Sequence, residues 1–200
     1  MGSGRTPLRR GLAELPFLAV IALVVAFVLK TFVAQAFYIP SGSMEPQLHV
    51  GDRVIVSKLA YQLHEPRRGD IIVFPSPEDH TRDDSPLPIR VLRGIFEGVG
   101  LAKPTKEILI KRVIALPGET VEGNGGRVYI NGLPLVEPYL SARVVTGNFG
   151  PTTIPKGDVW VMGDNRGDSR DSRFIGPITE SSVIGRAIAK VWPLGSQSFL

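Results

Sequence analysis

Residues 39–48, Ile-Pro-Ser-Gly-Ser-Met-Glu-Pro-Gln-Leu, form the stretch of this sequence best suited to chemistry. Two serines, Ser41 and Ser43, flank a glycine between two prolines, directly after the longest apolar run of the chain. A serine hydroxyl at its ordinary pKa is a poor nucleophile, so catalysis by either serine needs a neighbouring base. The stretch is therefore either a polar linker or one half of a nucleophile and base pair.

Histidine is the usual base, but the three histidines of this chain lie beside turns or in proline-rich segments. Nothing in the spacing of His49, His64 and His80 supports a Ser-His-Asp triad. No G-x-S-x-G sequence surrounds a serine and no S-x-x-K pair occurs among the seven lysines, so the hydrolase and penicillin-binding templates do not fit. The chain has no cysteine, which excludes a thiolate nucleophile, a disulfide framework and a cysteine-based metal site.

Lysine is the remaining candidate base, and it acts as one only where burial disfavours its charged form and lowers its pKa. Lys111 lies inside the apolar run 108–116, whose β-branched residues predict a strand. In a strand, three apolar side chains share its face: Leu109, Val113 and Ala115. Lys58 and Lys190 are weaker instances of the same pattern. The alternative for Lys111, a charged head that reaches water from an apolar stem, is the commoner one.

The elements that must hold these residues are predicted to be mainly β. The composition is 43% apolar with 22 Gly and 17 Pro, which favours a compact, turn-rich domain. Short runs rich in β-branched residues, separated by turn signals, predict an antiparallel domain connected by hairpins. The predicted strands are 53–57, 71–74, 108–116, 127–130, 159–162 and 183–191.

The charge of the chain is mild, with 23 Lys and Arg against 19 Asp and Glu. The basic residues form no stripe, so the sequence predicts no nucleic-acid partner, and membrane lipid is the more plausible anionic attractant. A calcium loop within residues 163–173 is excluded because Arg166 and Ser169 stand where an oxygen ligand and the turn glycine belong. We expect no metal and no cofactor.

Residues 12–36 are long and apolar enough to cross a bilayer as a helix, since about 20 helical residues suffice. Three arginines precede this segment and none of the next 15 residues is a lysine or an arginine, so residues 1–11 are expected in the cytoplasm and residues 37–200 outside it. The rival interpretation is a cleaved secretory signal, because Ala34-Gln35-Ala36 has the form of a cleavage site. The apolar length favours the single-pass anchor of a plasma membrane protein.

Two further segments complete the predicted organisation. The stretch 75–107 reads as an insertion in which positions 89, 92, 96 and 99 are apolar at helical spacing. This short helix is expected to pack on the sheet, with a position on the membrane surface as the alternative. Residues 119–156 are expected to form a small β-hairpin cap. The fold class is thus a transmembrane helix followed by an antiparallel β domain with a cap and a short inserted helix.

Four motifs follow one another in this chain: PSGSMEP after the apolar segment, then GDRVIVSK, IKRVIALPGE and GDNRGDSRDSR. In this order they resemble the sequence boxes of bacterial type I signal peptidase, the leader peptidase of the Ser/Lys class. The resemblance covers most of the chain, from the apolar segment to Arg173, and the combination is far more specific than any one motif. The insertion 75–107 is longer than is usual in that family, while the cap is as small as in its compact members.

The resemblance implies a serine endopeptidase that removes signal peptides from exported preproteins. Ser43 would be the nucleophile and Lys111 the neutral amine that accepts its proton. The Ser43 backbone N–H and the Ser41 hydroxyl would hold the oxyanion, and Ser169 would hydrogen-bond to the Lys111 amine and orient it. Two structural ion pairs would brace the site: Asp164 with Arg112, and Asp171 with Arg173.

The resemblance also implies how the substrate binds. An extended signal-peptide end would add as a strand beside residues 37–40 and 108–110, and shallow apolar pockets would admit only the small side chains of an A-x-A sequence. The implied pocket residues are Phe37, Ile39, Pro40, Met44, Leu48, Leu109 and Ile110.

Two other hypotheses remain open at this stage. The chain could be an anchored extracytoplasmic β domain that binds a partner, with Ser43 in a mere linker. It could instead be a Ser/Lys protease that cleaves itself, although the apolar segment and the lack of a DNA-binding half disfavour this.

Overall fold

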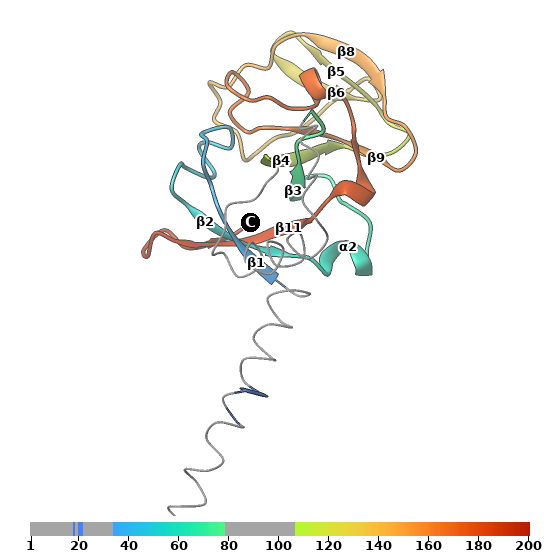
Figure 1. Ribbon diagram of the computed structural model, residues 1–200. Helices are drawn as coiled ribbons and strands as arrows, with labels where there is room; N and C mark the ends of the chain where they lie inside the picture. The colour runs from blue at the N-terminus through green and yellow to red at the C-terminus, as the bar shows by residue number, and fades with distance from the viewer. Residues whose placement is uncertain (1–17, 19, 22–33, 79–106) are drawn as a thin grey trace, which may run out of the picture.

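The computed structural model describes residues 34–78 and 107–200, together with residues 18, 20 and 21, which have helical backbone (Figure 1). Among these residues, no helix combines the length and the apolarity that crossing a bilayer requires. The predicted cytoplasmic tail 1–11, nearly all of the predicted membrane helix and the predicted inserted helix lie outside the described residues.

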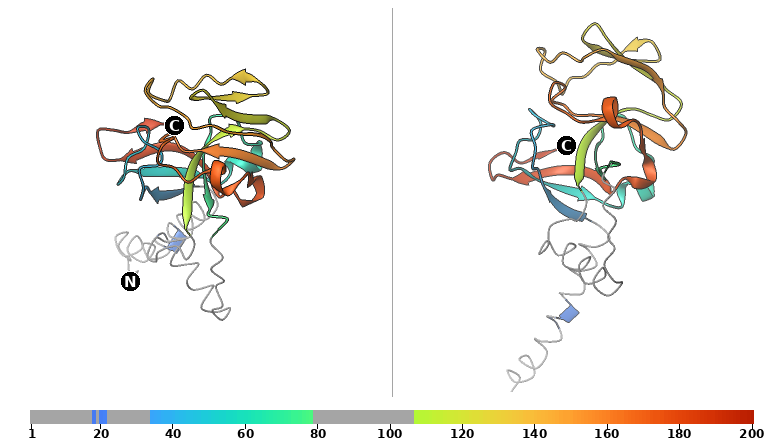
Figure 2. Two further views of the ribbon diagram at one scale, coloured as in Figure 1. Left: turned by 90° about the horizontal axis from the view of Figure 1, so that it is seen from above. Right: turned by 45° about the horizontal axis from the view of Figure 1, so that its top comes forward.

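The described chain is built mainly from two antiparallel sheets, which Figure 2 shows as two layers. The larger sheet has the order β1 (Ala34–Tyr38), β2 (Arg53–Ser57), β11 (Gly185–Trp192), β3 (Ile71–Pro75), β4 (Ile108–Ala115), β9 (Asp158–Met162), β10 (Ile178–Thr179), and β12 (Ser198–Phe199) pairs with β11. The smaller sheet has the order β7 (Leu133–Pro134), β6 (Arg127–Ile130), β5 (Thr120–Asn124), β8 (Phe149–Thr153). Short helical elements are α2 (Ala60–Leu63), α4 (Ser172–Ile175) and the 3₁₀-helix η2 (Glu180–Ser182).

The prediction of a mainly antiparallel β domain is confirmed, and each predicted strand is present to within two residues at either end. The smaller sheet lies within residues 120–153, inside the predicted cap, and we call it the cap sheet. It forms the top of the molecule in Figure 1, above β4 and β9.

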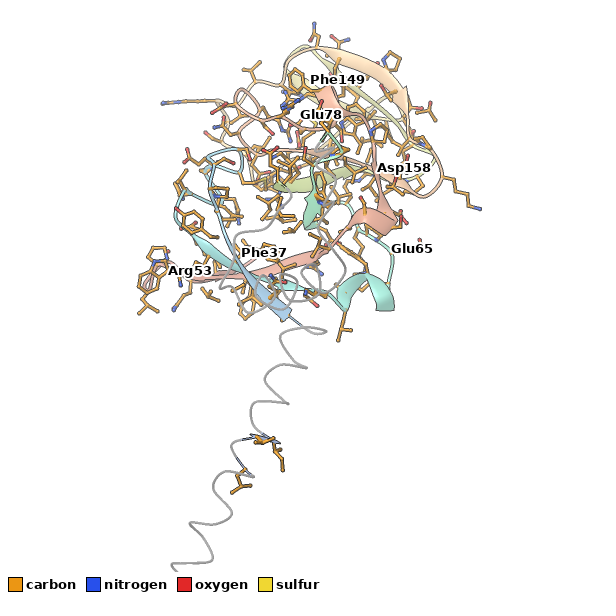
Figure 3. All side chains as sticks on the ribbon, viewed as in Figure 1. Phe37, Arg53, Glu65, Glu78, Phe149 and Asp158 are labelled. Carbon is orange, nitrogen blue, oxygen red and sulfur yellow. The ribbon has the colours of Figure 1, made fainter. Side chains whose placement is uncertain are left out.

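One boundary of the predicted membrane helix is wrong. Strand β1 begins at Ala34, three residues inside the predicted span 12–36, and pairs with β2 from Ala34 opposite Ser57 to Tyr38 opposite Arg53. The small residues of this segment allow either structure, and pairing with β2 decides for a strand because it satisfies the backbone groups through a neighbour. In Figure 3, Phe37 is seen on this strand.

Three clusters of buried apolar side chains hold the sheets together. One lies between residues 39–48, which we call the nucleophile segment, and strands β2, β3 and β11, and it includes Ile39, Met44 and Leu48. A second joins the cap sheet to β4 and β9 and includes Trp160, whose ring stacks on Phe149 at a centroid distance of 5.6 Å. The third covers the other side of β3, β4 and β9. The cap is therefore fixed by apolar packing to the strand that carries Lys111.

Candidate active site

The structure brings Ser43 and Lys111 together although 68 positions separate them in the sequence. The Lys111 amine donates a hydrogen bond to Ser43 Oγ over 2.7 Å and another to the Ile110 carbonyl over 2.9 Å. Both side chains are buried, with 7% of Ser43 and 2% of Lys111 exposed. A distance of 2.7 Å is within the range that direct proton transfer requires.

Burial changes the acid strength of the lysine. Desolvation lowers the pKa of Lys111 from 10.5 to about 8, against the opposing effect of the carboxylates of Asp171, Glu107 and Asp164. Because the neutral amine is the form that accepts a proton, this shift makes Lys111 a base of usable strength near neutral pH. The serine hydroxyl and the amine thus have the geometry and the electrostatics of a nucleophile and base pair.

Strand β4 keeps Lys111 dry because almost its whole length is buried. Ile72 of β3 lies opposite Lys111 in the register, and Ile72, Leu109 and Val113 pack in the same apolar cluster. The prediction that Ala115 also shares the face of Lys111 is wrong. A register shift in the pairing with β9 falls between Val113 and Ala115 and directs Ala115 into the cluster beneath the cap.

Both predicted ion pairs are present. The guanidinium of Arg112 donates to the two carboxylate oxygens of Asp164 over 2.8 and 2.6 Å and stacks 4.0 Å from the centre of the Tyr139 ring. Arg173 donates to both oxygens of Asp171 over 2.8 and 2.9 Å. Asp164 and Asp171 are fully buried, so each pair fixes a loop that borders Ser43 and Lys111.

Ser169 is close to the pair, but it does not make the predicted hydrogen bond to Lys111. Its buried hydroxyl has no hydrogen-bond partner within the part of the chain that the structure describes. A Cβ atom placed on Gly163 would lie 2.2 Å from Ser169 Oγ and 2.4 Å from the Ser43 carbonyl oxygen. The absence of a side chain at Gly163 therefore allows Ser169 and Ser43 to lie close to this backbone. Lys111 instead orients its amine on the carbonyl of Ile110, a contact that sequence analysis could not foresee because the acceptor belongs to the backbone.

Ser41 lies on the exposed side of the nucleophile. Its hydroxyl donates to Ser43 Oγ across 3.4 Å, a long contact that leaves it free to turn toward another acceptor. The Ser43 carbonyl accepts from the Asn165 backbone N–H over 3.1 Å. The two serines therefore stand side by side, with Ser43 fixed and Ser41 at the surface.

Most of the predicted pocket residues lie around the nucleophile. Five of them share one apolar cluster: Phe37, Ile39, Met44, Leu48 and Ile110. Pro40 is exposed beside that cluster. Leu109 is separated from the others, because its side chain packs in a different cluster, with Ile72 and Val113.

Sequence analysis missed four residues next to this site. Arg166, for which the motif indicated no role, is 3% exposed and forms an ion pair with Glu137 of the cap. Tyr139 donates to the same carboxylate over 2.7 Å. The side-chain amide of Asn165 donates to the Gly42 carbonyl over 3.2 Å. For Arg166, the sequence offered one indication of a role, which is its charge within the motif 163–173. For the other three residues it offered none.

The comparisons with known proteins identify the family of this chain. The model of the signal peptidase family, peptidase S26, matches residues 12–192. A signal peptidase I of Leptolyngbya laminosa is 42% identical over 189 residues, covering 94% of this chain and 82% of the relative. A signal peptidase I of Mycobacterium tuberculosis is 39% identical over 92% of this chain and 74% of the relative.

Solved structures include a signal peptidase I from Enterococcus faecalis V583, 32% identical, which aligns over 62% of this chain and 97% of that one with a TM-score of 0.44. The family assignment rests on the sequence matches, which extend over most of the chain and most of each relative. This chain therefore belongs to the signal peptidase family, peptidase S26, and is a serine endopeptidase.

Proposed function

We propose that this enzyme cleaves N-terminal signal peptides from exported preproteins, with Ser43 as nucleophile and Lys111 as general base. The observation that carries the proposal is the 2.7 Å contact between Ser43 Oγ and a buried lysine amine. The printed names of the relatives, signal peptidase I, support the substrate class.

In the proposed reaction, neutral Lys111 accepts the proton of Ser43 as Oγ attacks the scissile carbonyl carbon. The Lys111 ammonium then gives that proton to the leaving amine, so the C–N bond breaks and the signal peptide remains as an ester on Ser43. Lys111 next takes a proton from a water molecule, which hydrolyses the ester and restores the Ser43 hydroxyl. The Ile110 carbonyl holds one N–H of the amine throughout, which directs its lone pair at Ser43.

Charge on the tetrahedral intermediate needs donors that are already in position. We assign this role to the Ser43 backbone N–H and the Ser41 hydroxyl, which lies 3.4 Å from Ser43 Oγ. We assign to Ser169 the role of orienting the Lys111 amine through a hydrogen bond. Its buried hydroxyl has no partner among the described residues, and a small rotation on substrate binding would supply one.

We propose that the substrate specificity is for small side chains in an A-x-A pattern. Ile39, Met44 and Ile110 pack tightly behind the nucleophile, so little room remains for a large side chain there. An extended peptide would pair with the strands on either side, beside residues 37–40 and 108–110.

We further propose a single-pass plasma membrane protein with a cytoplasmic N-terminus. Residues 12–33 would form the anchor, since Ala34 is already in β1, and the arginines of the first ten residues favour this orientation. Membrane lipid is thus a partner, and the domain from residue 34 onward works outside the cytoplasm. The pairing of Ala34–Ala36 with β2 withholds this sequence from self-cleavage.

Cleavage of a purified preprotein in detergent tests the proposal. Ser43→Ala and Lys111→Ala should each lower the rate to the uncatalysed background, while Ser182→Ala and Lys156→Ala, at solvent-accessible and exposed positions respectively, should retain it. Cleavage by the Lys111→Ala enzyme at the rate of the unmodified enzyme would overturn the assignment of the base. Absence of processing by the unmodified enzyme would favour the partner-binding hypothesis instead.

A further inference from the structure

A single residue outside the nucleophile segment holds the two carbonyl groups next to Ser43. The backbone N–H of Asn165 donates to the Ser43 carbonyl over 3.1 Å, and the side-chain amide of Asn165 donates to the Gly42 carbonyl over 3.2 Å. These two bonds fix successive peptide units, and the Ser43 side chain projects from the chain between them. The position of Ser43 Oγ therefore depends on where Asn165 stands.

The turn that carries Asn165 is itself held from two sides. From outside the turn, Asp171, the N-cap residue of α4, accepts from the Gly163 N–H over 2.9 Å. From within the turn, Arg166 Nε donates to the Gly163 carbonyl over 3.1 Å, and the Arg166 backbone N–H donates to the Asp164 carbonyl over 3.0 Å. Arg166 thus closes the turn around Asn165.

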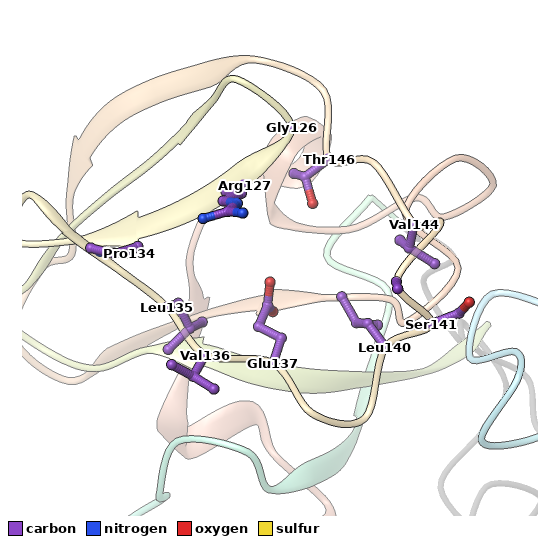
Figure 4. A pocket seen from close by; sticks show the side chains of 11 residues that line it. Gly126, Arg127, Pro134, Leu135, Val136, Glu137, Leu140, Ser141, Val144 and Thr146 are labelled. Atoms are coloured by element: carbon purple, nitrogen blue, oxygen red, sulfur yellow. The ribbon is translucent and has the colours of Figure 1, made fainter.

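The guanidinium group of Arg166 contacts the cap. It donates to both carboxylate oxygens of Glu137 and to the Thr146 hydroxyl, the latter over 2.8 Å. Tyr139 donates to Glu137 over 2.7 Å, which leaves that carboxylate few free acceptor positions. Figure 4 shows the cavity of about 360 Å³ in the cap, where the side chains of Glu137 and Thr146 point toward one another.

This arrangement is not required merely to attach the cap. The apolar cluster around Trp160 and Met162 already joins the cap sheet to β4 and β9. A buried ion pair gains little over apolar packing because both charges must lose their water. A bidentate arginine pair does, however, fix an orientation more closely than apolar contacts do, since its donors lie in one rigid plane.

We propose that Asn165 is a positioning residue for the Ser43 nucleophile, and that Glu137 of the cap acts on the nucleophile through Arg166 and Asn165. This inference rests on the proposed function, because it takes Ser43 as the reacting group. A displacement of about 1 Å at a reacting atom lowers a rate by about 100-fold. Loss of the Asn165 amide should therefore appear in kcat, while substrate binding along the strands is retained.

The test measures kcat, KM and the thermal midpoint of Asn165→Ala, Glu137→Gln and the double variant on one signal-peptide substrate. We expect kcat to fall by about 10- to 100-fold in Asn165→Ala, with KM within about twofold and the pH of the acid limb unchanged. Glu137→Gln should lower kcat by a smaller factor. The double variant should match Asn165→Ala alone, because the two residues act in one chain of contacts.

Asn131→Gly is the matched control. Asn131 also makes one side-chain hydrogen bond to a backbone group, from the Thr120 N–H over 2.8 Å, but it lies in the cap away from Ser43. Glycine accepts the positive φ of 51° at this position. This variant should lose thermal stability and keep its kcat.

Asn165→Asp covers the case in which the alanine variant does not fold. It keeps the size of the side chain but removes the donor, so its kcat should fall at least as far. A kcat within twofold of the unmodified enzyme in the folded variants, or multiplicative losses in the double variant, would overturn the inference. Activity in Ser43→Ala would instead overturn the proposed function, so the two failures are distinguishable.

Discussion

Lowering the pH should reduce the kcat/KM of this enzyme, because the Lys111 amine becomes protonated. Burial lowers the pKa of Lys111 from 10.5 to about 8. This difference corresponds to about 3 kcal/mol of preference for the neutral amine. At pH 7 about 10% of the enzyme would carry the neutral amine, compared with about 0.03% for an ordinary lysine, a gain of about 300-fold in active form.

The carboxylates near Lys111 provide a way to shift the acid limb of the pH profile of kcat/KM. Glu107 lies one residue before β4, and its negative charge raises the pKa of Lys111. Replacement by Glu107→Gln removes that charge, stabilises the ammonium less and should shift the acid limb to lower pH. Glu122→Gln, which neutralises a carboxylate in the cap sheet, is the matched control and should leave the limb in place.

The assay is kcat/KM for a fluorogenic signal-peptide substrate, measured between pH 5.5 and 10.5 at constant ionic strength. The profile of kcat/KM reports the free enzyme, so it should rise about tenfold per pH unit up to about pH 8 and then level off. A plateau that extends below pH 6, or a rise that continues to pH 10, would refute the reasoning. A Glu107→Gln limb displaced upward would refute the assigned cause.

Three further predictions concern stability and packing. Gly163→Ala should abolish activity because its Cβ would lie 2.4 Å from the Ser43 carbonyl oxygen, whereas Gly167→Ala, with open space around it, should be silent in a cleavage assay. Asp164→Asn leaves a buried arginine without its charge partner and should cost about 3 to 5 kcal/mol in urea unfolding, whereas Glu78→Gln, at the exposed ion pair with Arg170, should cost at most about 1. Lys111→Met should raise the free energy of unfolding by up to about 3 kcal/mol at pH 7. Since the pKa of Lys111 is lowered on folding, this gain should shrink as the pH rises from about 8 to 10.5, and an unchanged gain at pH 10.5 would contradict it.

The sequence was sufficient to predict the larger strands because their apolar periodicity is strong. Strand β3 is a continuous apolar run, and β4 is an apolar run that only Lys111 and Arg112 interrupt. Strands β5 and β8 escaped prediction since Thr-Val-Glu-Gly-Asn and Phe-Gly-Pro-Thr-Thr contain residues that are depleted in strands. They form because the cap cluster buries Val121 and Phe149 packs against it, which is a tertiary effect that no local pattern carries.

The same distinction applies to the candidate site. The Ser-Gly-Ser turn and the lysine within an apolar strand made Ser43 and Lys111 candidates, and the resemblance of their motifs to the signal peptidase family selected them as a pair. The contact between the Asn165 N–H and the Ser43 carbonyl could not be predicted, since it joins backbone groups of segments far apart in the chain. The contact of the Lys111 amine with the Ile110 carbonyl could not be predicted either, since its acceptor is a backbone group. Arg166 and Glu137 are separated by 29 positions, and neither stands out by composition.

The most direct measurement is peptide mapping by mass spectrometry after reaction with a serine-directed acylating probe. The unmodified enzyme should carry one acyl group, on Ser43, and the rate of labelling should rise with pH up to about 8 as the Lys111 amine loses its proton. The Lys111→Ala variant should remain unlabelled over the same time. An acyl group on another residue, or labelling of Lys111→Ala at the unmodified rate, would contradict the pairing of this hydroxyl with this amine.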